Sequence, residues 1–392
     1  MDNVDTIYLD NQATTRTDPR VLAKMAVAWG DGFGNPHSAE HCIGWRAAAS
    51  VDASALAVGA LVGADQDEVI FTSGATEANN LALLGLRDQS QRSGRRRILM
   101  SAIEHKSVLA AGRYLSDCGE CELVLIGVDR DGLIDLPNLT RQLDDDALLV
   151  SVMAVNNEIG VIQDIAAIGK LAAKAGALFH CDAAQAPCAF DTRDLLTHAD
   201  LISLSAHKLY GPSGIGALVV RRDVQSILSP LIHGGGQQNG LRSGTVPLPL
   251  CAGFGAAAEL LCGDEARRER ERVGVVRDLF IAALAELCVE TRLNGAAGDL
   301  RHPGNANLLF SSVAAADVIA AMQPFVAASS GSACTSGIPE PSHVLKAMGL
   351  TSDEADRSVR FSFGRYSTED DARRAALIVN EAVARVSEPT RP

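Results

Sequence analysis

Short apolar runs alternate with amphipathic stretches between about residues 69 and 220. The runs are too short for helices and are rich in Val, Ile and Leu, which is typical of buried strands. They start at Val69, Arg97, Leu148, Ala177 and Ile215. Between them lie stretches such as 165–175, where apolar residues recur at three- and four-residue spacing, as in an amphipathic helix. The alternation predicts an α/β fold with a mainly parallel sheet flanked by helices.

The pattern changes in the last third of the chain. Residues 263–286 begin with many charged side chains and continue as an apolar stretch, which predicts a long, partly solvated helix. Such a helix suits a connection to a second unit. We therefore expect a large domain at 15–261 and a smaller α/β domain formed by 1–14 and 262–392, with a loop at about 327–340.

Composition restricts the class of function. The chain has 392 residues, 47% of them hydrophobic, and can bury a large core. Its 48 acidic and 35 basic residues give a formal net charge of -13, which argues against direct binding to a nucleic-acid backbone. Because no apolar run reaches the ~18 residues of a membrane span, we expect no membrane contact and a cytoplasmic location.

The nine cysteines and nine histidines bear on redox chemistry and metals. In a chain of this class, reduced thiols are expected rather than a disulfide framework. Cys118 and Cys121 have the spacing of a redox or zinc pair, but no second pair follows at zinc-ribbon distance, which favours a plain loop. The histidines show no metal spacing, so we expect no metal site.

Polar residues follow two neighbouring apolar runs, and ligands of parallel sheets bind at such strand ends. Asp182 and Gln185 follow one run, and Ser205, His207 and Lys208 follow the next. A lysine amine forms a Schiff base with the aldehyde of pyridoxal phosphate, and an aspartate keeps the pyridine nitrogen protonated so that the ring accepts electrons. Taken alone, Lys208 is more typical of a solvated loop lysine.

Three further segments fit the binding of an anion or a flat ring. Residues 71–80 follow a strand and open a helix, so their backbone N–H groups suit a phosphate, although an ordinary capped helix also explains them. Residues 233–245 are glycine-rich and form either a flexible connection or a close backbone approach to a ligand. His105 suits stacking on a cofactor or proton exchange, but is equally consistent with a surface histidine.

Two residues in the last third suit reactions of an amino acid. Cys334 lies in a run of small and polar residues, which predicts a mobile arm, and a thiol of pKa ~8.5 must be deprotonated to act as a nucleophile. Arg360 suits a bidentate pair with a carboxylate. The alternatives are a loop cysteine without a role and a surface arginine.

Taken in order, these runs resemble the cysteine desulfurases of the NifS/IscS type, within the class V aminotransferase family. The matching segments are Tyr8–Thr15, Thr72–Glu77, Glu104–Lys106, Asn156–Gly160, Asp182–Gln185, Ser205–Lys208, His233–Gly236, Arg242–Thr245, Ser330–Ser336 and Val359–Arg365. The resemblance covers almost the whole chain. It implies a fold-type I pyridoxal-phosphate enzyme, with a large domain, a smaller α/β domain and pyridoxal 5'-phosphate as cofactor.

The resemblance also implies how the cofactor is held. Lys208 carries it covalently and afterwards moves the substrate proton. Asp182 pairs with the pyridine nitrogen, Gln185 with the phenolic oxygen, and His105 stacks over the ring.

For the phosphate, the resemblance implies a group of residues at a helix start and a strand end. Ala75, Thr76, Ser205 and His207 come from one subunit. Thr245 comes from the other, which implies a homodimer.

For the substrate, the resemblance implies L-cysteine. Asn156 and Arg360 hold its carboxylate, and Cys334 attacks its sulfur, becomes a persulfide and leaves L-alanine. The persulfide then passes its sulfur to an acceptor protein, either a scaffold or a sulfur carrier.

The sequence departs from the family pattern at three places. Asn11 and Gln12 replace the usual Tyr-Ser, Ala184 replaces a common threonine, and Ala206 replaces a common glycine. None removes a catalytic group, but they leave the acceptor open among iron–sulfur assembly, tRNA thiolation, DNA phosphorothioation and natural-product sulfuration. A fold-related aminotransferase, a selenocysteine lyase and an inactive cofactor-binding scaffold remain as alternatives.

Overall fold

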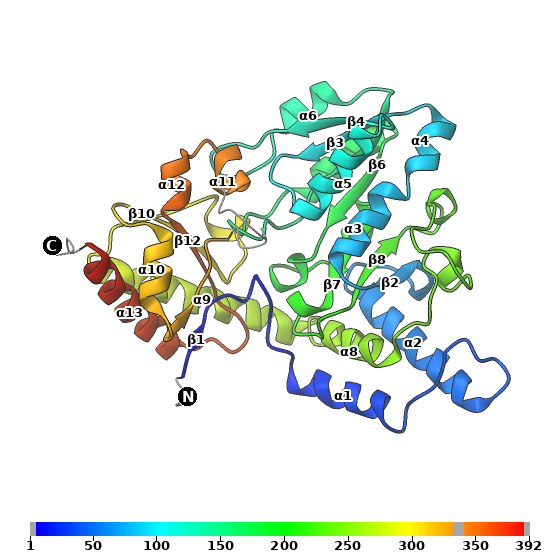
Figure 1. The fold of residues 1–392 in the computed structure, drawn as a ribbon, viewed down its shortest axis with the longest axis horizontal. Helices are drawn as coiled ribbons and strands as arrows, with labels where there is room; N and C mark the ends of the chain where they lie inside the picture. The colour runs from blue at the N-terminus through cyan, green and yellow to red at the C-terminus, as the bar shows by residue number, and fades with distance from the viewer. Residues whose placement is uncertain (1–4, 332–340, 388–392) are drawn as a thin grey trace.

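A seven-stranded sheet forms the centre of the larger unit in the computed structural model, which describes residues 5–331 and 341–387. The strand order is β2 (Val69–Thr72), β8 (Gly216–Val220), β7 (Leu201–Ser205), β6 (Leu178–Asp182), β5 (Ala147–Ser151), β3 (Arg97–Ser101) and β4 (Glu122–Ile126). Only β8 runs antiparallel to its neighbours among these strands. The predicted α/β fold with a mainly parallel sheet is therefore confirmed (Figure 1).

Helices cover both faces of this sheet, and alternate side chains of each strand point to opposite faces. One face packs on α3 (Ala75–Leu84) and α5 (Lys106–Asp117), with Leu201 and Leu218 in the shared core. The other face packs on α2 (Cys42–Ala60), α7 (Ile165–Ala175) and α8 (Leu248–Glu259). The strands read as continuous apolar runs because both of their faces are buried.

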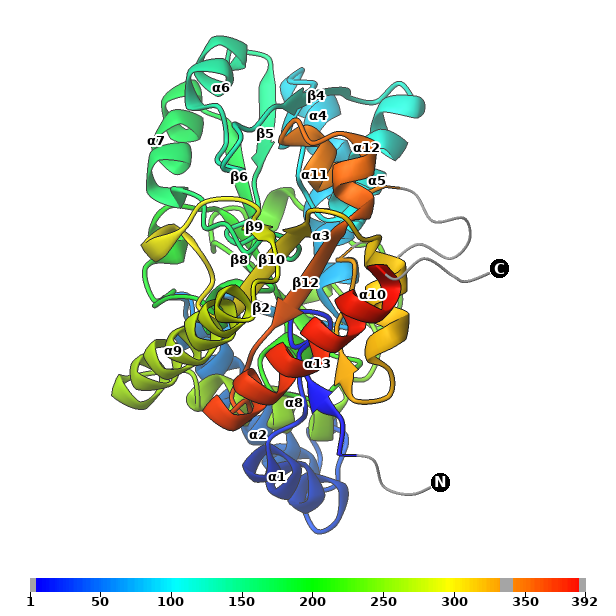
Figure 2. The same cartoon turned by 90° about the vertical axis from the view of Figure 1, so that its left-hand side faces the viewer.

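The smaller unit has an antiparallel sheet of β9 (Thr291–Leu293), β10 (Asn305–Phe310) and β12 (Ser358–Ser362). Its core also takes side chains from α9 (Asp264–Glu286), α10 (Ala315–Met322) and α13 (Glu369–Ser387) (Figure 2). The N-terminal strand β1 (Ile7–Tyr8) pairs with β11 (Val326–Ala327) of this unit. The helix expected at 263–286 is α9. The exact division of the chain into two domains stays a prediction.

The remaining helices are α1 (Pro19–Trp29), which packs on α8, α4 (Arg87–Ser93), α6 (Leu136–Gln142), α11 (His343–Ala347) and α12 (Ser352–Asp356). No helix in residues 5–331 and 341–387 has both the length and the apolar character needed to cross a membrane.

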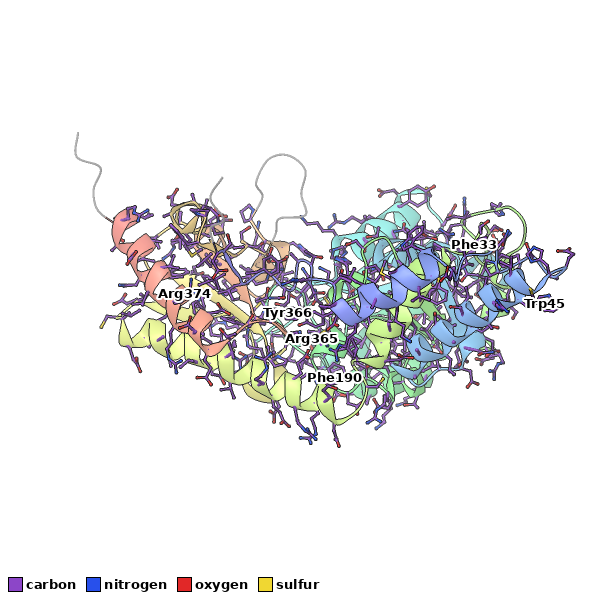
Figure 3. The ribbon with its side chains drawn as sticks, turned by 90° about the horizontal axis from the view of Figure 1, so that it is seen from below. Phe33, Trp45, Phe190, Arg365, Tyr366 and Arg374 are labelled. Atoms are coloured by element: carbon purple, nitrogen blue, oxygen red, sulfur yellow. The ribbon has the colours of Figure 1, made fainter. Side chains whose placement is uncertain are left out.

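A partly buried cluster of charged and aromatic side chains joins the two units; Arg365 and Tyr366 of this cluster are labelled in Figure 3. Arg365, which follows β12, bonds to Asp18 at 2.8 Å and to Glu269 of α9 at 2.7 Å. Its guanidinium lies 4.1 Å from the centre of the Tyr210 ring. The Tyr210 hydroxyl accepts from the Arg365 N–H at 2.7 Å, and the Tyr366 hydroxyl donates to Asp18 at 3.2 Å. These contacts fix β12 and the N-terminal segment relative to the larger sheet.

Candidate active site

A cavity of about 600 Å³ lies at the carboxyl ends of β6 and β7, beside the start of α3. The residues that line it are Gln12, Ala13, Ser73, Gly74, Ala75, Thr76, His105, Lys106, Met153, Val155, Asn157, Asp182, Ala184, Gln185, Ser205, His207, Lys208, Ser213, Gly214, Gly331 and Arg360. Most of the residues proposed from sequence therefore meet in one place. Its size is within the usual range for a small-molecule site.

Lys208 ends a short 3₁₀ turn after β7, and its side chain reaches the N-terminal segment. Nζ donates to the main-chain carbonyls of Gln12 and Ala13, both at 2.6 Å. Gln185, from the turn after β6, donates from Nε2 to the same Gln12 carbonyl at 2.9 Å. The lysine amine is therefore placed between the larger sheet and the segment that pairs with the smaller unit.

Asp182 is the last residue of β6 and is buried. Oδ1 accepts from the Ala184 N–H at 3.0 Å, and Oδ2 accepts from the Asn79 amide at 2.8 Å. These two donors hold a carboxylate ready to pair with a cationic N–H. Asn79 is on α3 one turn after Thr76, on the same helix face, because residues three apart on a helix are neighbours.

The negative charge of Asp182 also acts on its neighbours. Burial, and then the charge of Asp182, raises the pKa of Glu104 well above its ordinary value. Its Oε1 accepts from the Met153 N–H at 2.5 Å. Burial lowers the pKa of His180 to about 4, so this histidine is neutral at pH 7. Burial therefore disfavours a charge on both of these neighbours of Asp182.

His105 is the N-cap of α5, and its orientation is set by Ser107. Nδ1 accepts from the Ser107 N–H at 3.2 Å and lies 2.7 Å from the Ser107 hydroxyl. Because Nδ1 is an acceptor here, the neutral ring carries its proton on Nε2. Asn79 donates to the same hydroxyl at 2.9 Å, so one amide contacts both Asp182 and the group that orients His105.

The end of the cavity at α3 suits an anion. Ser73, Gly74, Ala75 and Thr76 line it at the start of a ten-residue helix, where N–H groups and the helix dipole favour negative charge. Gly74 has a φ of 155°, and β8 lies close behind it.

Two residues at the end of β7 complete this part of the cavity. Ser205 and His207 line it, and His207 Nδ1 lies 3.1 Å from the Thr14 hydroxyl. Burial, and then the charge of Lys208, lowers the pKa of His207 to about 4, so this ring acts as a neutral hydrogen-bonding group.

Arg360 closes the opposite side of the cavity from β12. Its side chain is 3% exposed. Nη2 donates to Asp10 Oδ1 at 2.6 Å, and Nη1 donates to the Asn157 carbonyl at 2.8 Å. An arginine fixed in this way can present its remaining surface to a substrate carboxylate.

The comparisons with known proteins agree with this geometry. The family model for class V aminotransferases matches residues 7–374. The chain is 44% identical over 367 residues to the cysteine desulfurase IscS of Rickettsia akari (strain Hartford), covering 93% of this chain and 88% of that protein. A solved NifS-like protein is 31% identical and aligns with a TM-score of 0.88, covering 97% of this chain and 99% of the other. SspA in complex with cysteine is 35% identical with a TM-score of 0.79, covering 92% and 99%.

The chain belongs to the class V aminotransferase family. Within the family it is a cysteine desulfurase of the IscS/NifS type, and such enzymes depend on pyridoxal 5'-phosphate. The residues present fit this cofactor. Lys208 supplies an amine for the aldehyde, Asp182 a buried carboxylate for the pyridine nitrogen, and the start of α3 a cradle for the phosphate.

Two proposed residues of this desulfurase do not line the cavity, and a third lies outside the described residues. Asn156 is fully buried. Its Oδ1 accepts from the N–H groups of Glu158 and Ile159, and its Nδ2 donates to the Ile103 carbonyl, so the side chain stabilises the turn after β5. The next residue, Asn157, lines the cavity instead. Thr245 is exposed and outside the cavity lining of its own chain. Cys334 lies outside the described residues, but Gly331, three positions earlier, lines the cavity.

Sequence reasoning missed Asn79 and Asp10 as parts of this site. Both occur in matching or neighbouring motif runs, but their roles depend on contacts with Asp182 and Arg360, which are more than 100 residues away in the chain. For Asn79, the sequence offers one signal: it follows Thr76 by three residues on a predicted helix, so both side chains are expected on the same helix face.

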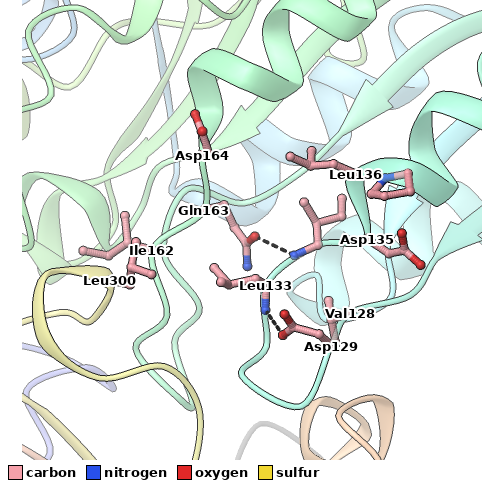
Figure 4. A pocket seen from close by; sticks show the side chains of 11 residues that line it. Val128, Asp129, Leu133, Asp135, Leu136, Ile162, Gln163, Asp164 and Leu300 are labelled. Atoms are coloured by element: carbon pink, nitrogen blue, oxygen red, sulfur yellow. Dashed lines mark hydrogen bonds between the residues drawn. The ribbon is translucent and has the colours of Figure 1, made fainter.

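A second, larger cavity of about 680 Å³ lies near α6 and α7 (Figure 4). Its lining is apolar apart from Gln163 and three aspartates. Asp129, Asp135 and Asp164 each accept from backbone N–H groups of their own turns or helix starts. The residues that line it include no lysine, histidine or cysteine, so it lacks the groups that the chemistry requires.

Proposed function

We propose that this enzyme removes the sulfur of L-cysteine, with Lys208 and Asp182 as its central pair, and passes the sulfur through Cys334 to an acceptor protein. The observation that carries the proposal is the position of Lys208 and Asp182 in one cavity, with Arg360 on its opposite side. When bound, the cofactor withdraws electrons from the substrate Cα and so weakens the bonds around it.

Each residue of the chain has a defined task in this proposal. Asp182 keeps a proton on the pyridine nitrogen, and Arg360 holds the substrate carboxylate. The Lys208 amine takes the proton from Cα and later returns a proton to the carbon that becomes the alanine methyl group. His105 would contact the ring of the bound cofactor, and its neutral imidazole carries the proton on Nε2 because Nδ1 accepts from the Ser107 N–H.

Sulfur transfer requires a thiolate close to the substrate sulfur. The Cys334 thiolate attacks that sulfur, the carbon–sulfur bond breaks, and a sulfur–sulfur bond forms on the enzyme. The electron pair of the broken bond stays with the carbon and is neutralised by a proton, so the products are L-alanine and the Cys334 persulfide. A thiol or another nucleophile of an acceptor protein then takes the terminal sulfur.

We also propose a homodimer in which Thr245 completes the phosphate site of the partner subunit. Large apolar side chains on α1, α2 and the loop between them support this: Trp29, Phe33 and Trp45 are 67%, 63% and 59% exposed. Phe33 and Trp45 are labelled in Figure 3. Such exposure is typical of protein interfaces. Thr245 leads into α8, which packs on both α1 and α2.

Alanine and sulfide release from L-cysteine, in the presence of a reductant, tests the proposed function directly. A desulfurase yields both products from L-cysteine. Activity only with selenocysteine, only transamination, or no turnover of the cofactor-loaded protein would each contradict the proposal.

A further inference from the structure

Gln12 leaves one donor of its side chain unpaired beside the cavity. The residue is 2% exposed and lines the same cavity as Lys208 and Arg360. Its Nε2 has no hydrogen-bond partner among the described residues. Buried polar atoms almost always have partners, so an unpaired donor at a binding cavity indicates an acceptor that arrives with a ligand.

Every other polar atom of Gln12 is paired. Its main-chain N–H donates to the Ser362 hydroxyl at 3.0 Å, and its carbonyl accepts from Lys208 and Gln185 at 2.6 and 2.9 Å. Its side-chain Oε1 accepts from Asn305 Nδ2 at 2.5 Å. The residue is therefore held in place through its main chain and Oε1, while the NH2 group of its side chain has no partner among the described residues.

The orientation of the Gln12 amide is fixed from behind. Asn305 Oδ1 accepts from the buried Arg301 at 2.6 Å, and Asn305 Nδ2 also donates to the Glu158 carbonyl at 3.0 Å. Asn305 must therefore turn its N–H groups toward Gln12, and Gln12 must turn its oxygen toward Asn305. The Nε2 atom consequently lies on the side away from Asn305.

Arg360 has a second unpaired donor at the same cavity. Its Nη atoms are used by Asp10 and the Asn157 carbonyl, whereas its buried Nε has no partner among the described residues. Gln12 and Arg360 both line this cavity, and each is tied to the pair formed by Asp10 and Ser362: Arg360 bonds to Asp10, and the Gln12 N–H donates to Ser362. A carboxylate has two oxygens that only accept, which matches two leftover donors.

We propose that Gln12 Nε2 donates to the α-carboxylate of the amino-acid substrate, next to Arg360, and so contributes to specificity for amino acids over simple amines. The inference rests on the proposed function, because it takes the substrate to be an amino acid. Asp10 lies 2.6 Å from Arg360 and repels a second carboxylate, so a neutral amide donor offsets part of that repulsion.

The test compares ligands with and without a carboxylate on the cofactor-loaded enzyme. In Gln12→Ser and Gln12→Met, we expect KM for L-cysteine to rise about ten- to a hundredfold with kcat little changed, as for one hydrogen bond to a charged group. The affinity for the product L-alanine should fall by the same factor, whereas the affinity for cysteamine, which lacks the carboxylate, should not change. Asn11→Ala is the matched control, because Asn11 bonds to the Ser362 carbonyl and is outside the cavity lining.

The outcomes separate this inference from the proposed function. Unchanged L-alanine affinity in both Gln12 variants overturns the inference, and so does an equal loss for L-alanine and cysteamine. Cofactor content and circular dichroism identify a variant that fails to fold, and the other variant then decides. A wild-type enzyme that releases no alanine from L-cysteine would overturn the proposed function, while the two affinities still test the role of Gln12.

Discussion

The side-chain amide of Asn79 lies 2.8 Å from Asp182 Oδ2 and holds this carboxylate from the α3 side. The second N–H of the same amide donates to the Ser107 hydroxyl, which contacts His105 Nδ1. The two residues proposed to contact the cofactor ring, one at its nitrogen and one above it, are thus positioned through one buried asparagine.

Replacing Asn79 should weaken the hold on the cofactor. Asn79→Ala removes a hydrogen bond to a charged group, and such bonds contribute about 1.5–3 kcal/mol. We expect cofactor affinity, measured by titrating the apoenzyme and following visible absorbance, to fall about tenfold or more. Asn80→Ala is the control, since Asn80 is on the same helix but bonds only to the Thr76 carbonyl. Equal affinities of the two variants would show that the Asn79 contacts do not position Asp182.

The parts of the site that sequence could predict are those set by strand ends. Lys208 and Asp182 follow apolar runs, and parallel strands bring such residues to one edge of the sheet. The closure of the cavity by Gln12 and Arg360 was not predictable from local pattern, because it depends on a bridge between residues 10 and 362. Strand β4 was also missed, since its residues are only partly buried and its pattern is weak.

The roles of two buried side chains were hidden for a similar reason. Asn156 belongs to a motif run, yet its amide hydrogen-bonds within the turn, and only the folded chain distinguishes it from Asn157 at the cavity. Glu104 precedes a proposed catalytic histidine, and its sequence position is typical of a surface acid, but it is fully buried and its pKa is raised well above the ordinary value. Sequence spacing indicates neither the hydrogen bonds of Asn156 nor the burial of Glu104.

Lys208→Ala should abolish the yellow colour of the purified protein. The colour arises from the covalent bond between the cofactor and a lysine amine, and Lys208 follows a strand end and lines the same cavity as Asp182. Lys106→Ala tests the assignment sharply, because Lys106 lines the same cavity. We expect this control to keep its visible absorbance. An unchanged spectrum in Lys208→Ala, or a loss only in Lys106→Ala, would assign the covalent role to another lysine.

The cluster of Asp18 and Arg365 that joins the two units should make the free energy of unfolding depend on pH under acid conditions. Hydrogen bonds from Arg20, and then from Arg365, hold the pKa of the Asp18 carboxyl below its ordinary value of 3.8, against the effect of burial. A depressed pKa stabilises the fold above the ordinary pKa, and this contribution is lost as the pH falls below about 3.8. Asp18→Asn should therefore be about 2 kcal/mol less stable at pH 7 and should lose less stability on acidification.

Denaturant unfolding at pH 7 and pH 3 measures this difference. Glu271→Gln is the control, because Glu271 pairs with Arg267 on the exposed surface of α9, where an ion pair contributes little. If Asp18→Asn and wild type lose the same stability between the two pH values, the cluster does not contribute to acid sensitivity.

Thr245 should contribute to cofactor binding only in the homodimer, because it is proposed to complete the phosphate site of the partner subunit. Thr245→Ala is expected to form the dimer normally but to bind cofactor more weakly, since it removes one hydroxyl from the partner subunit's phosphate site. Light scattering gives the mass, and cofactor titration gives the affinity. An active monomer, or a crystal structure with Thr245 far from both phosphates, would contradict the proposal.

Cys334 should separate cofactor chemistry from sulfur transfer. The residues that act on the ring and on the substrate Cα are Lys208, Asp182 and His105, and none belongs to the cysteine-containing run. Of the eight other cysteines, all in the described part, none lines the cavity. Cys188 contacts Lys208, with Sγ 3.5 Å from the Lys208 carbonyl, but burial raises the pKa of Cys188 to about 12 and keeps it a thiol at neutral pH.

Cys334→Ser should therefore bind cofactor normally and still change its absorbance on addition of L-cysteine. Alanine release should fall by roughly a hundredfold or more, because a serine hydroxyl is far less ionised and far less nucleophilic than a thiol. Mass spectrometry should find no persulfide on the variant, whereas Cys188→Ser should keep both alanine release and the persulfide. Near-normal alanine release by Cys334→Ser would mean that a different thiol accepts the sulfur, and the persulfide would then be found on that residue.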